Sequence, residues 1–221
     1  MDLQEAMRTR HSVRAYTDRK IEGETLEELR RTVEECNRDS GLHIQLCTDE
    51  PEAFSGMMAR YGKFRNVRNY IALVGKKDET FEERCGYYGE KLVLKAAQLG
   101  LNTCWVALTF SKGKTAAAVG PGEKLLMVIT IGYGENAGVP HKTKSPEELS
   151  SANGDAPEWF RRGVEAAQLA PTAMNQQKFR FTLRGDIVAA SPGSGFYTKT
   201  DLGIAKYHFE AGAGSEGWRW A

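Results

Sequence analysis

The sequence predicts an α+β fold, because patterns typical of amphipathic helices alternate with short, strongly apolar strands. Residues 26–38 repeat apolar side chains at helical spacing, whereas Tyr70–Gly75 is an almost continuous apolar run, as expected for a central strand covered on both faces. At 221 residues, 41% of them hydrophobic, the chain is long enough to bury a core and favours one domain or two. We treat residues 1–221 as a single domain.

The composition argues against several classes of function. A net charge of +1 argues against nucleic acid as the main partner. No apolar run approaches the roughly 20 residues that span a bilayer, and the polar N-terminus does not resemble a signal peptide. The four cysteines form no C-x-x-C pair, which favours buried free thiols over disulfides or a metal site. We therefore expect a cytoplasmic protein that uses no metal and contacts neither membrane nor nucleic acid.

The first half contains three predicted helices and three predicted strands. Asp2–Arg10 is a short helix, and Thr25–Glu28 has the pattern of a capping box that opens a helix through about Arg38. The remaining predicted elements are strands over Leu42–Cys47, Tyr70–Gly75 and Lys124–Tyr133, and a helix over Phe81–Leu99 with Gly100 as its C-terminal cap. Residues 48–69 have no clear pattern and suit a loop or short helix over a pocket.

The second half begins with a helix at Asp155–Glu158, with Pro157 in its first turn. Its predicted buried face consists of Trp159, Phe160, Val164 and Ala167. The helix ends at Ala170-Pro171, because the residue before a proline is pushed away from helical geometry. A strand over Lys178–Leu183, a turn at Ser191–Gly195, a helix over Asp201–Ala211 and a Gly- and Trp-rich tail follow.

Two stretches are candidates for ligand binding. The first, Arg10-His11-Ser12-Val13-Arg14, offers two guanidiniums, an imidazole and a hydroxyl. A phosphate there could take charge-assisted hydrogen bonds that contribute roughly 1.5–3 kcal/mol each. The alternative is a solvated loop whose arginines face water. The second stretch, Ala170–Phe181, carries small and amide residues where a flat, polar-edged ligand could lie.

Together these stretches resemble the two flavin-contacting motifs of the FMN-dependent nitroreductase family, Arg-Arg-Ser-Val-Arg and Ala-Pro-Ser-Ala-x-Asn. His11 stands in place of the second arginine. Three further segments are similar to motifs of that family, namely Gly100–Trp105, Gly132–Gly134 and Lys142–Glu148. In ordinary members the two flavin motifs lie close together, whereas here they stand near opposite ends of the chain.

The resemblance implies a three-layer α/β/α fold with a mixed, mainly antiparallel central sheet. It also implies FMN as the cofactor. The residues that would bind FMN are Arg10, His11, Ser12, Lys142 and Lys144 around the phosphate and ribityl chain, Arg14 and Asn175 at the carbonyl edge of the ring, the peptide groups of Ala107 and Leu108 at its pyrimidine edge, Pro171, Thr172, Ala173 and Met174 along its side, and Gln177 at its rim.

Besides His11, three of these positions depart from the family pattern. Lys144 stands where arginine is usual, which keeps the charge but loses the bidentate fork. Alanine and leucine at 107 and 108 replace the common glycine, so the backbone approaches the flavin less easily. The alternative for Lys142 and Lys144 is a pair of solvated lysines in a linker.

The activity that the resemblance implies is an oxidoreductase that passes electrons from NAD(P)H through FMN to a nitroaromatic, a quinone or a similar flat small molecule. No catalytic side chain is needed, because the cofactor carries the chemistry. Two alternatives stay open: a flavin protein without turnover or with another reaction, such as reductive dehalogenation or flavin breakdown, and an anion-binding or interaction domain with no flavin.

Similar segments recur in the two parts of the chain. Leu29–Cys36 and the strand after it parallel Phe160–Ala167 and the strand Phe179–Leu183, and Lys91–Trp105 parallels Lys206–Trp220. We interpret residues 1–149 and 150–221 as the halves of an internal duplication. The chain would then be a monomeric pseudo-dimer that holds one FMN, and the alternative is an ordinary homodimer.

Overall fold

The computed structural model describes residues 1–221 as two compact units that interleave along the sequence. The first unit comprises Met1–Asp2, Thr9–Phe81 and Leu92–Pro140, and the second comprises Leu3–Arg8, Glu82–Lys91 and His141–Ala221. Helices and strands occur in both units, so the predicted α+β class is confirmed. The strands form two four-stranded sheets rather than one central sheet.

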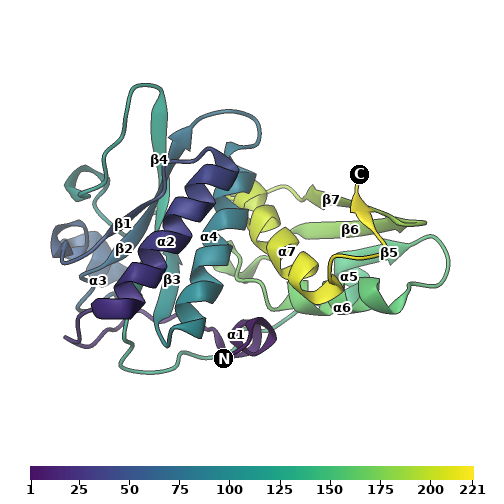
Figure 1. Ribbon diagram of the computed structural model, residues 1–221, viewed down its shortest axis with the longest axis horizontal. Helices are drawn as coiled ribbons and strands as arrows, with labels where there is room; N and C mark the ends of the chain where they lie inside the picture. The colour runs from purple at the N-terminus through teal and green to yellow at the C-terminus, as the bar shows by residue number, and fades with distance from the viewer. The chain divides into compact units, whose positions relative to one another are not determined.

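The first unit is built on an antiparallel sheet in the order β1-β2-β4-β3. Its elements are α2 (Gly23–Ser40), β1 (Gln45–Cys47), the 3-10 turn η1 (Pro51–Phe54), α3 (Met57–Tyr61), β2 (Tyr70–Lys76), the second half of α4 (Phe81–Gln98), β3 (Asn102–Val106), η2 (Lys112–Lys114) and β4 (Glu123–Gly132). Strand β2 is buried from Tyr70 to Gly75, as its apolar run predicts. Helix α2 and the second half of α4 lie on one face of this sheet (Figure 1).

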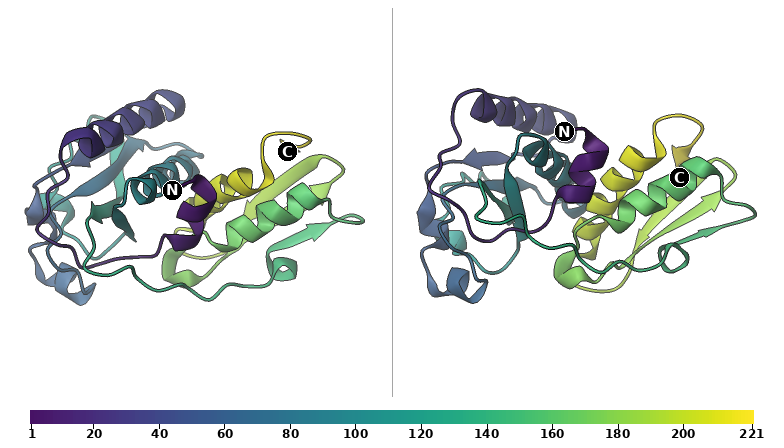
Figure 2. Two further views of the ribbon diagram at one scale, coloured as in Figure 1. Left: turned by 60° about the horizontal axis from the view of Figure 1, so that its bottom comes forward. Right: turned by 90° about the horizontal axis from the view of Figure 1, so that it is seen from below.

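The second unit has a mixed sheet in the order β5-β6-β7-β8, in which β6 and β7 are antiparallel and the outer strands are parallel to their neighbours. Its elements are α1 (Leu3–Thr9), the first half of α4, α5 (Pro146–Leu149), β5 (Ser150–Ala152), α6 (Glu158–Gln168), η3 (Ala173–Asn175), β6 (Phe179–Arg184), β7 (Ile187–Pro192), α7 (Thr198–Ala213) and β8 (Arg219–Trp220). Helices α6 and α7 lie side by side on one face of this sheet (Figure 2).

The core of the second unit is largely aromatic. The ring of Phe209 on α7 packs 4.6 Å from that of Phe181 and 5.7 Å from that of Phe160. A fully buried hydrogen bond of 2.9 Å joins His208 Nε2 to Glu90 Oε1, and so ties α7 to the first half of α4. Removing one partner of such a buried hydrogen bond typically costs about 1–3 kcal/mol, because the other group is left unsatisfied.

Several local predictions are wrong. The capping box at Thr25–Glu28 is absent, because α2 already begins at Gly23 after an N-cap residue, Glu22, that makes no side-chain hydrogen bond. The predicted strand over Leu42–Cys47 is shorter: β1 covers only Gln45–Cys47, although the amide of His43 already bonds to the carbonyl of Val74. Pro157 precedes α6 as its N-cap rather than lying in its first turn.

Other differences concern burial and the short strands near the C-terminus. Trp159 is only half-buried, because its ring stacks on the partly exposed Trp218 rather than entering the core. Strands β7 and β8 are not predicted: β8 has only two residues, and only Val188 of β7 is buried. All four cysteines are buried free thiols, as predicted. None of the helices combines the length and the apolar character that crossing a bilayer requires.

Candidate functional site

In the first unit, the segment Arg10–Arg14 lies beside strand β3. The amide of Val13 donates to the carbonyl of Thr103 at 3.0 Å, and Ser12 forms a parallel bridge to the same residue. Strand β3 then leads directly to Ala107 and Leu108. The structure therefore places the predicted cationic motif next to the strand that delivers the predicted backbone contacts.

The guanidinium of Arg10 is the most unusual group in this segment. Arg10 is only 6% exposed, yet its Nε atom has no hydrogen-bond partner. A buried donor without a partner costs free energy of about 1–3 kcal/mol, more if it is charged. An anion that accepted this hydrogen bond would remove the cost.

The thiol of Cys104 on β3 lies in the electrostatic field of the Arg10–Arg14 segment. Burial raises the pKa of Cys104, and the charge of Arg14, a hydrogen bond with Ser12 and the charge of Arg10 oppose that rise. The guanidiniums of Arg10 and Arg14 and the hydroxyl of Ser12 are therefore all close enough to influence the buried thiol of Cys104. Cys104 is not among the predicted site residues, although its position in the Gly100–Trp105 motif is the signal that could have found it.

The backbone around Gly138 passes close over the same segment. A Cβ atom on Gly138 would lie 2.7 Å from the Cβ of His11 and 3.0 Å from the carbonyl oxygen of Ser12, and the φ of Gly138 is +73°. Both constraints require glycine at this position. His11 and Ser12 are half-buried beneath it, whereas Arg14 is exposed, with its guanidinium 6.0 Å from the ring centroid of Phe64.

In the second unit, Gln177 connects the predicted Ala170–Phe181 stretch with the predicted lysine segment at Lys142 and Lys144. The side chain is 3% exposed, its Oε1 accepts from the amide of Lys144 at 2.8 Å, and its Nε2 donates to the carbonyl of Lys142 at 2.8 Å. Asn175 Nδ2 donates to the same carbonyl at 2.8 Å. The structure thus brings Lys142, Lys144, Asn175 and Gln177 together, with the amide of Gln177 fully used in holding the chain.

The ammonium of Lys144 donates to the carbonyl of Gln177 at 3.2 Å, so it keeps two further N–H donors for a ligand. Lys142 presents its exposed side chain beside it. These lysines are therefore fixed at their backbones rather than carried on a free linker.

The loop between α6 and β6 is held in an unfavourable conformation. Met174, Asn175 and Gln177 have φ values of 51°, 52° and 45°, which non-glycine residues adopt rarely. Such strain persists only where the surroundings hold it, and it is commonest at functional sites. Met174 is 98% exposed, while Pro171, Thr172 and Ala173 are half-buried.

Asp201 on α7, which is not among the predicted site residues, anchors this loop. Its Oδ1 accepts from the amide of Ala173 at 2.9 Å and its Oδ2 from Gln176 Nε2 at 2.7 Å. Burial raises the pKa of Asp201 to about 6, against the opposing effect of these two hydrogen bonds. An acidic residue among the buried residues of a helix is the signal that could have found it.

The Asp201→Asn variant should therefore alter the pH dependence of stability. In the folded chain the carboxyl titrates near 6 rather than near 4, so its protonated form stabilises the fold fully below about pH 4, and this contribution is lost as the pH rises through 6. The loss amounts to roughly 2–3 kcal/mol. Urea denaturation from pH 4 to 7.5 should show the natural chain losing that much relative to the variant. Parallel profiles would contradict the assignment.

No group of three or more His, Cys, Asp or Glu side chains is placed to hold a metal ion. The first unit offers a buried guanidinium whose Nε has no partner, with a hydroxyl nearby. The second unit, taken by itself, offers a strained amide-bearing loop backed by two lysines. The free donor of Arg10 suits an anion, so this residue fits the flavin phosphate that the family resemblance implies.

Comparison with solved structures supports the fold. The "putative nitroreductase" of Thermotoga maritima is 22% identical, with a TM-score of 0.62 over 95% of this chain and 82% of that one. A "putative nitroreductase in complex with FMN" from Desulfovibrio desulfuricans is 19% identical, with a TM-score of 0.54 over 71% of this chain and 98% of that one.

A third similar structure is the "putative NADH dehydrogenase/NAD(P)H nitroreductase" of Bacteroides thetaiotaomicron. It is 19% identical, with a TM-score of 0.53 over 66% of this chain and 95% of that one. At these identities the similarity shows the fold alone. No curated protein sequence matches the chain.

The sequence model of one protein family matches residues 2–213, nearly the whole chain. That family is described as "Putative TM nitroreductase". The match confirms the resemblance drawn from the motifs, and the chain belongs to this nitroreductase family.

Proposed function

We propose that the chain is an FMN-dependent oxidoreductase of the nitroreductase type. The observation that carries the proposal is the buried guanidinium of Arg10, whose Nε lacks a partner beside the hydroxyl of Ser12. Family membership and the FMN complex of the D. desulfuricans protein support flavin phosphate as the anion that completes this group. The buried free thiols favour a reducing, cytoplasmic setting.

The residues that we propose for the phosphate and ribityl end are Arg10, His11, Ser12, Lys142 and Lys144. Arg10 would supply an N–H that is already desolvated, so binding would cost little further desolvation. Lys144 would use the two donors that Gln177 leaves free. The lysines add charge without the geometric specificity of an arginine fork.

The ring end would be held by backbone as much as by side chains. Arg14 would place a positive charge at the carbonyl edge, and the peptide groups of Ala107 and Leu108 would line the pyrimidine edge. The strained loop from Pro171 to Gln177 would form a rigid side wall, because Asp201 and the Lys142 carbonyl fix it from behind. Asn175 would contribute the second N–H of its Nδ2, since the first is donated to the Lys142 carbonyl and its Oδ1 accepts from Gln177 Nε2 at 3.0 Å.

When bound, FMN would accept electrons from NAD(P)H and pass them to a flat acceptor such as a nitroaromatic or a quinone. The name of the B. thetaiotaomicron protein includes NAD(P)H, which supports this donor. No G-x-G-x-x-G motif follows a strand in the sequence, so donor and acceptor would use the same face of the site in turn. Ping-pong kinetics are the expected consequence.

We further propose that one chain holds one FMN as an internal pseudo-dimer with halves 1–149 and 150–221. A reciprocal contact between α4 and α7 supports this. A Cβ on Gly86 would lie 2.0 Å from the carbonyl oxygen of Thr200, and a Cβ on Gly203 would lie 2.0 Å from that of Glu83. The residue offset that takes Gly86 to Gly203 also takes Glu83 to Thr200, so the two contacts are related as in an isologous two-fold interface.

The test is to purify the chain and measure its visible flavin spectrum, its flavin-to-protein ratio and its mass in solution. We expect one FMN per monomeric chain, and bleaching of the flavin band when NAD(P)H is added without oxygen. Flavin that stays oxidised with NAD(P)H would favour the flavin-binding protein without this turnover. A colourless protein that does not take up added FMN would contradict the proposal. An obligate dimer with flavins shared between chains would contradict the pseudo-dimer alone.

A further inference from the structure

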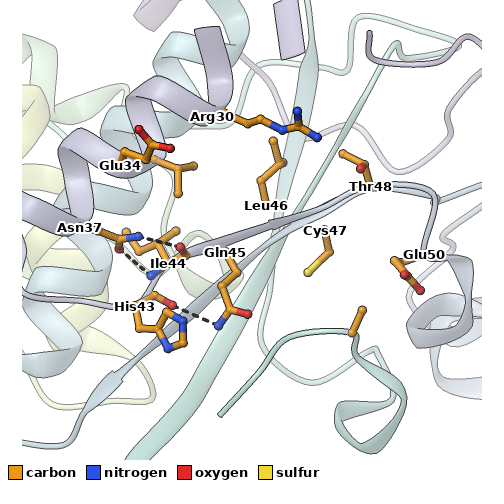
Figure 3. A pocket seen from close by; sticks show the side chains of 12 residues that line it. Arg30, Glu34, Asn37, His43, Ile44, Gln45, Leu46, Cys47, Thr48 and Glu50 are labelled. Atoms are coloured by element: carbon orange, nitrogen blue, oxygen red, sulfur yellow. Dashed lines mark hydrogen bonds between the residues drawn. The ribbon is translucent and has the colours of Figure 1, made fainter. Parts of the chain in front are cut away.

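A groove runs along the outer edge of strand β1 in the first unit (Figure 3). Its volume is about 610 Å³. One wall is formed by side chains of α2, and the other by the residues of β1 and its flanks; the lining consists of Arg30, Val33, Glu34, Asn37, His43–Thr48, Glu50 and Ala116. The groove is therefore an opening along the edge of a sheet, not a cavity enclosed by side chains.

The edge of β1 in this groove has unpaired backbone groups. The amide of His43 donates to Val74, and Gln45 and Cys47 face Ala72 and Tyr70 in the same antiparallel ladder. In such a ladder, alternate residues point their N–H and C=O groups away from the neighbouring strand. Ile44 and Leu46 are the outward-facing residues, and the groove lies on their side.

The side chain of Asn37 makes hydrogen bonds with the outward-facing backbone groups of Ile44 but not with those of Leu46. It accepts from the amide of Ile44 at 2.6 Å and donates to its carbonyl at 2.8 Å. No hydrogen bond is made by the outward groups of Leu46. Arg30 has no ion-pair or hydrogen-bond partner either, and its guanidinium reaches over Leu46 from α2 (Figure 3).

In the second unit, the corresponding edge is occupied. In the alignment of the two similar segments, Arg30 of α2 corresponds to Arg161 of α6. Asn37 of α2 then corresponds to Gln168 of α6. The strands correspond so that Ile44 matches Phe181 and Leu46 matches Leu183. These two residues of β6 are the ones that face Ser150 and Ala152 of β5, in a parallel pairing.

The segment around β5, which pairs with the corresponding edge of β6 in the second unit, shows what kind of chain such an edge can bind. Its leucine, Leu149, is fully buried. The amide of Asn153 donates to the carbonyl of Leu183 at 3.2 Å. The guanidinium of Arg180 donates to the carbonyls of Glu148 and Ser150, both at 3.1 Å.

We propose that the groove beside β1 binds an extended peptide segment of a partner protein, parallel to β1. The segment would carry one leucine-sized apolar residue followed by small residues, as Leu149–Ala152 does. Its backbone pairs with the outward N–H and C=O of Leu46, and its carbonyls accept from Arg30. Strand addition of this kind draws its affinity from main-chain hydrogen bonds and its specificity from side-chain pockets. The proposal rests on the groove and the repeated α-β unit, and is independent of flavin binding.

The probe is a fluorescein-labelled, acetylated peptide with the sequence of residues 145–153. Fluorescence anisotropy with the full chain should show saturable binding, at least tenfold weaker for the peptide carrying Leu149→Asp and for a scrambled peptide. Amide hydrogen exchange at saturation should slow at least tenfold at Leu46. No binding, or protection only outside β1, would overturn the proposal. The peptide could instead displace the chain's own β5 from β6. A change in amide-exchange protection confined to β6 would show this and would also overturn the proposal.

The variant Leu46→Pro removes the outward N–H while leaving the ladder to β2 intact, since proline is tolerated where an edge N–H faces away from the sheet. Its matched control is Leu46→Ala, which keeps that N–H. We expect the proline variant to lose peptide binding at least tenfold relative to the alanine variant. Equal binding by the two would refute strand addition. Self-association of the natural chain that disappears in Leu46→Pro would show that the occupant is a second copy and overturn the assignment to a partner.

Discussion

Replacing Gly86 with alanine should destabilise the second unit by about 3 kcal/mol, the upper part of the usual range for overpacking. The added Cβ would lie 2.0 Å from the carbonyl oxygen and 2.9 Å from the carbonyl carbon of Thr200, and 3.1 Å from the amide nitrogen of Ile204. All three atoms belong to the backbone of α7, so no rotamer change can relieve the clash. Urea denaturation followed by circular dichroism measures the loss.

The reciprocal variant, Gly203→Ala, should cost a similar amount, because its Cβ would lie 2.0 Å from the carbonyl of Glu83 and 2.7 Å from the amide of Tyr87. Gly113→Ala is the matched control, since a Cβ there meets nothing within 4 Å. The double variant should cost less than the sum, because either alanine alone already forces the helices apart. A stability of Gly86→Ala equal to that of the control would show that the helices do not cross this closely.

The glycine contact also suggests a register for the proposed internal repeat that differs from the one drawn from sequence. The motif comparison aligns Lys91 with Lys206, whereas the contact aligns Gly86 with Gly203 and therefore Lys91 with His208. In this register Gly100 corresponds to Gly217, and both have left-handed φ values, of 78° and 83°. Backbone requirements thus identify corresponding positions that side-chain identity does not.

Much of the fold is predictable because strong patterns control it. The fully buried run of β2, the long helix α4 and the break at Ala170-Pro171 depend on local chemistry, and all three lie where the sequence predicts. The division into two sheets is not predictable in this way. It depends on long-range pairing, such as that of β8 with β7, in which Trp220 contributes mainly through its ring contacts with Phe209 and Trp218.

The candidate site is predictable in its residue types but not in how they are used. Gln177 is predicted at the rim of a ligand, yet its buried amide holds Lys142 and Lys144 by their backbones. Asp201 belongs to no motif, and its only sequence signal is its place among the buried residues of a helix. Its role, which is to accept hydrogen bonds from a loop distant in sequence, follows from the fold. Sequence gives the polar groups, whereas only the fold decides which of them remain free.

Arg10→Ala should weaken FMN binding about a hundredfold. Arginine at this position would make two charge-assisted hydrogen bonds of roughly 1.5 kcal/mol each to the phosphate, and each 1.4 kcal/mol is a factor of about ten in affinity. Arg10→Lys, which keeps the charge but not the fork, should lose about tenfold. Fluorescence titration of flavin-free protein with FMN measures both losses.

The matched control is Arg8→Ala, which removes the same charge from an exposed position of α1. It should bind FMN as the natural chain does. Stability separates a ligand-binding role from a structural one. Because the Nε of Arg10 has no partner, the flavin-free Arg10→Ala protein should unfold at the same or a higher urea concentration than the natural chain. A variant that loses stability without flavin, or that binds FMN as tightly as Arg8→Ala, would show that this guanidinium supports the fold and is not the phosphate ligand.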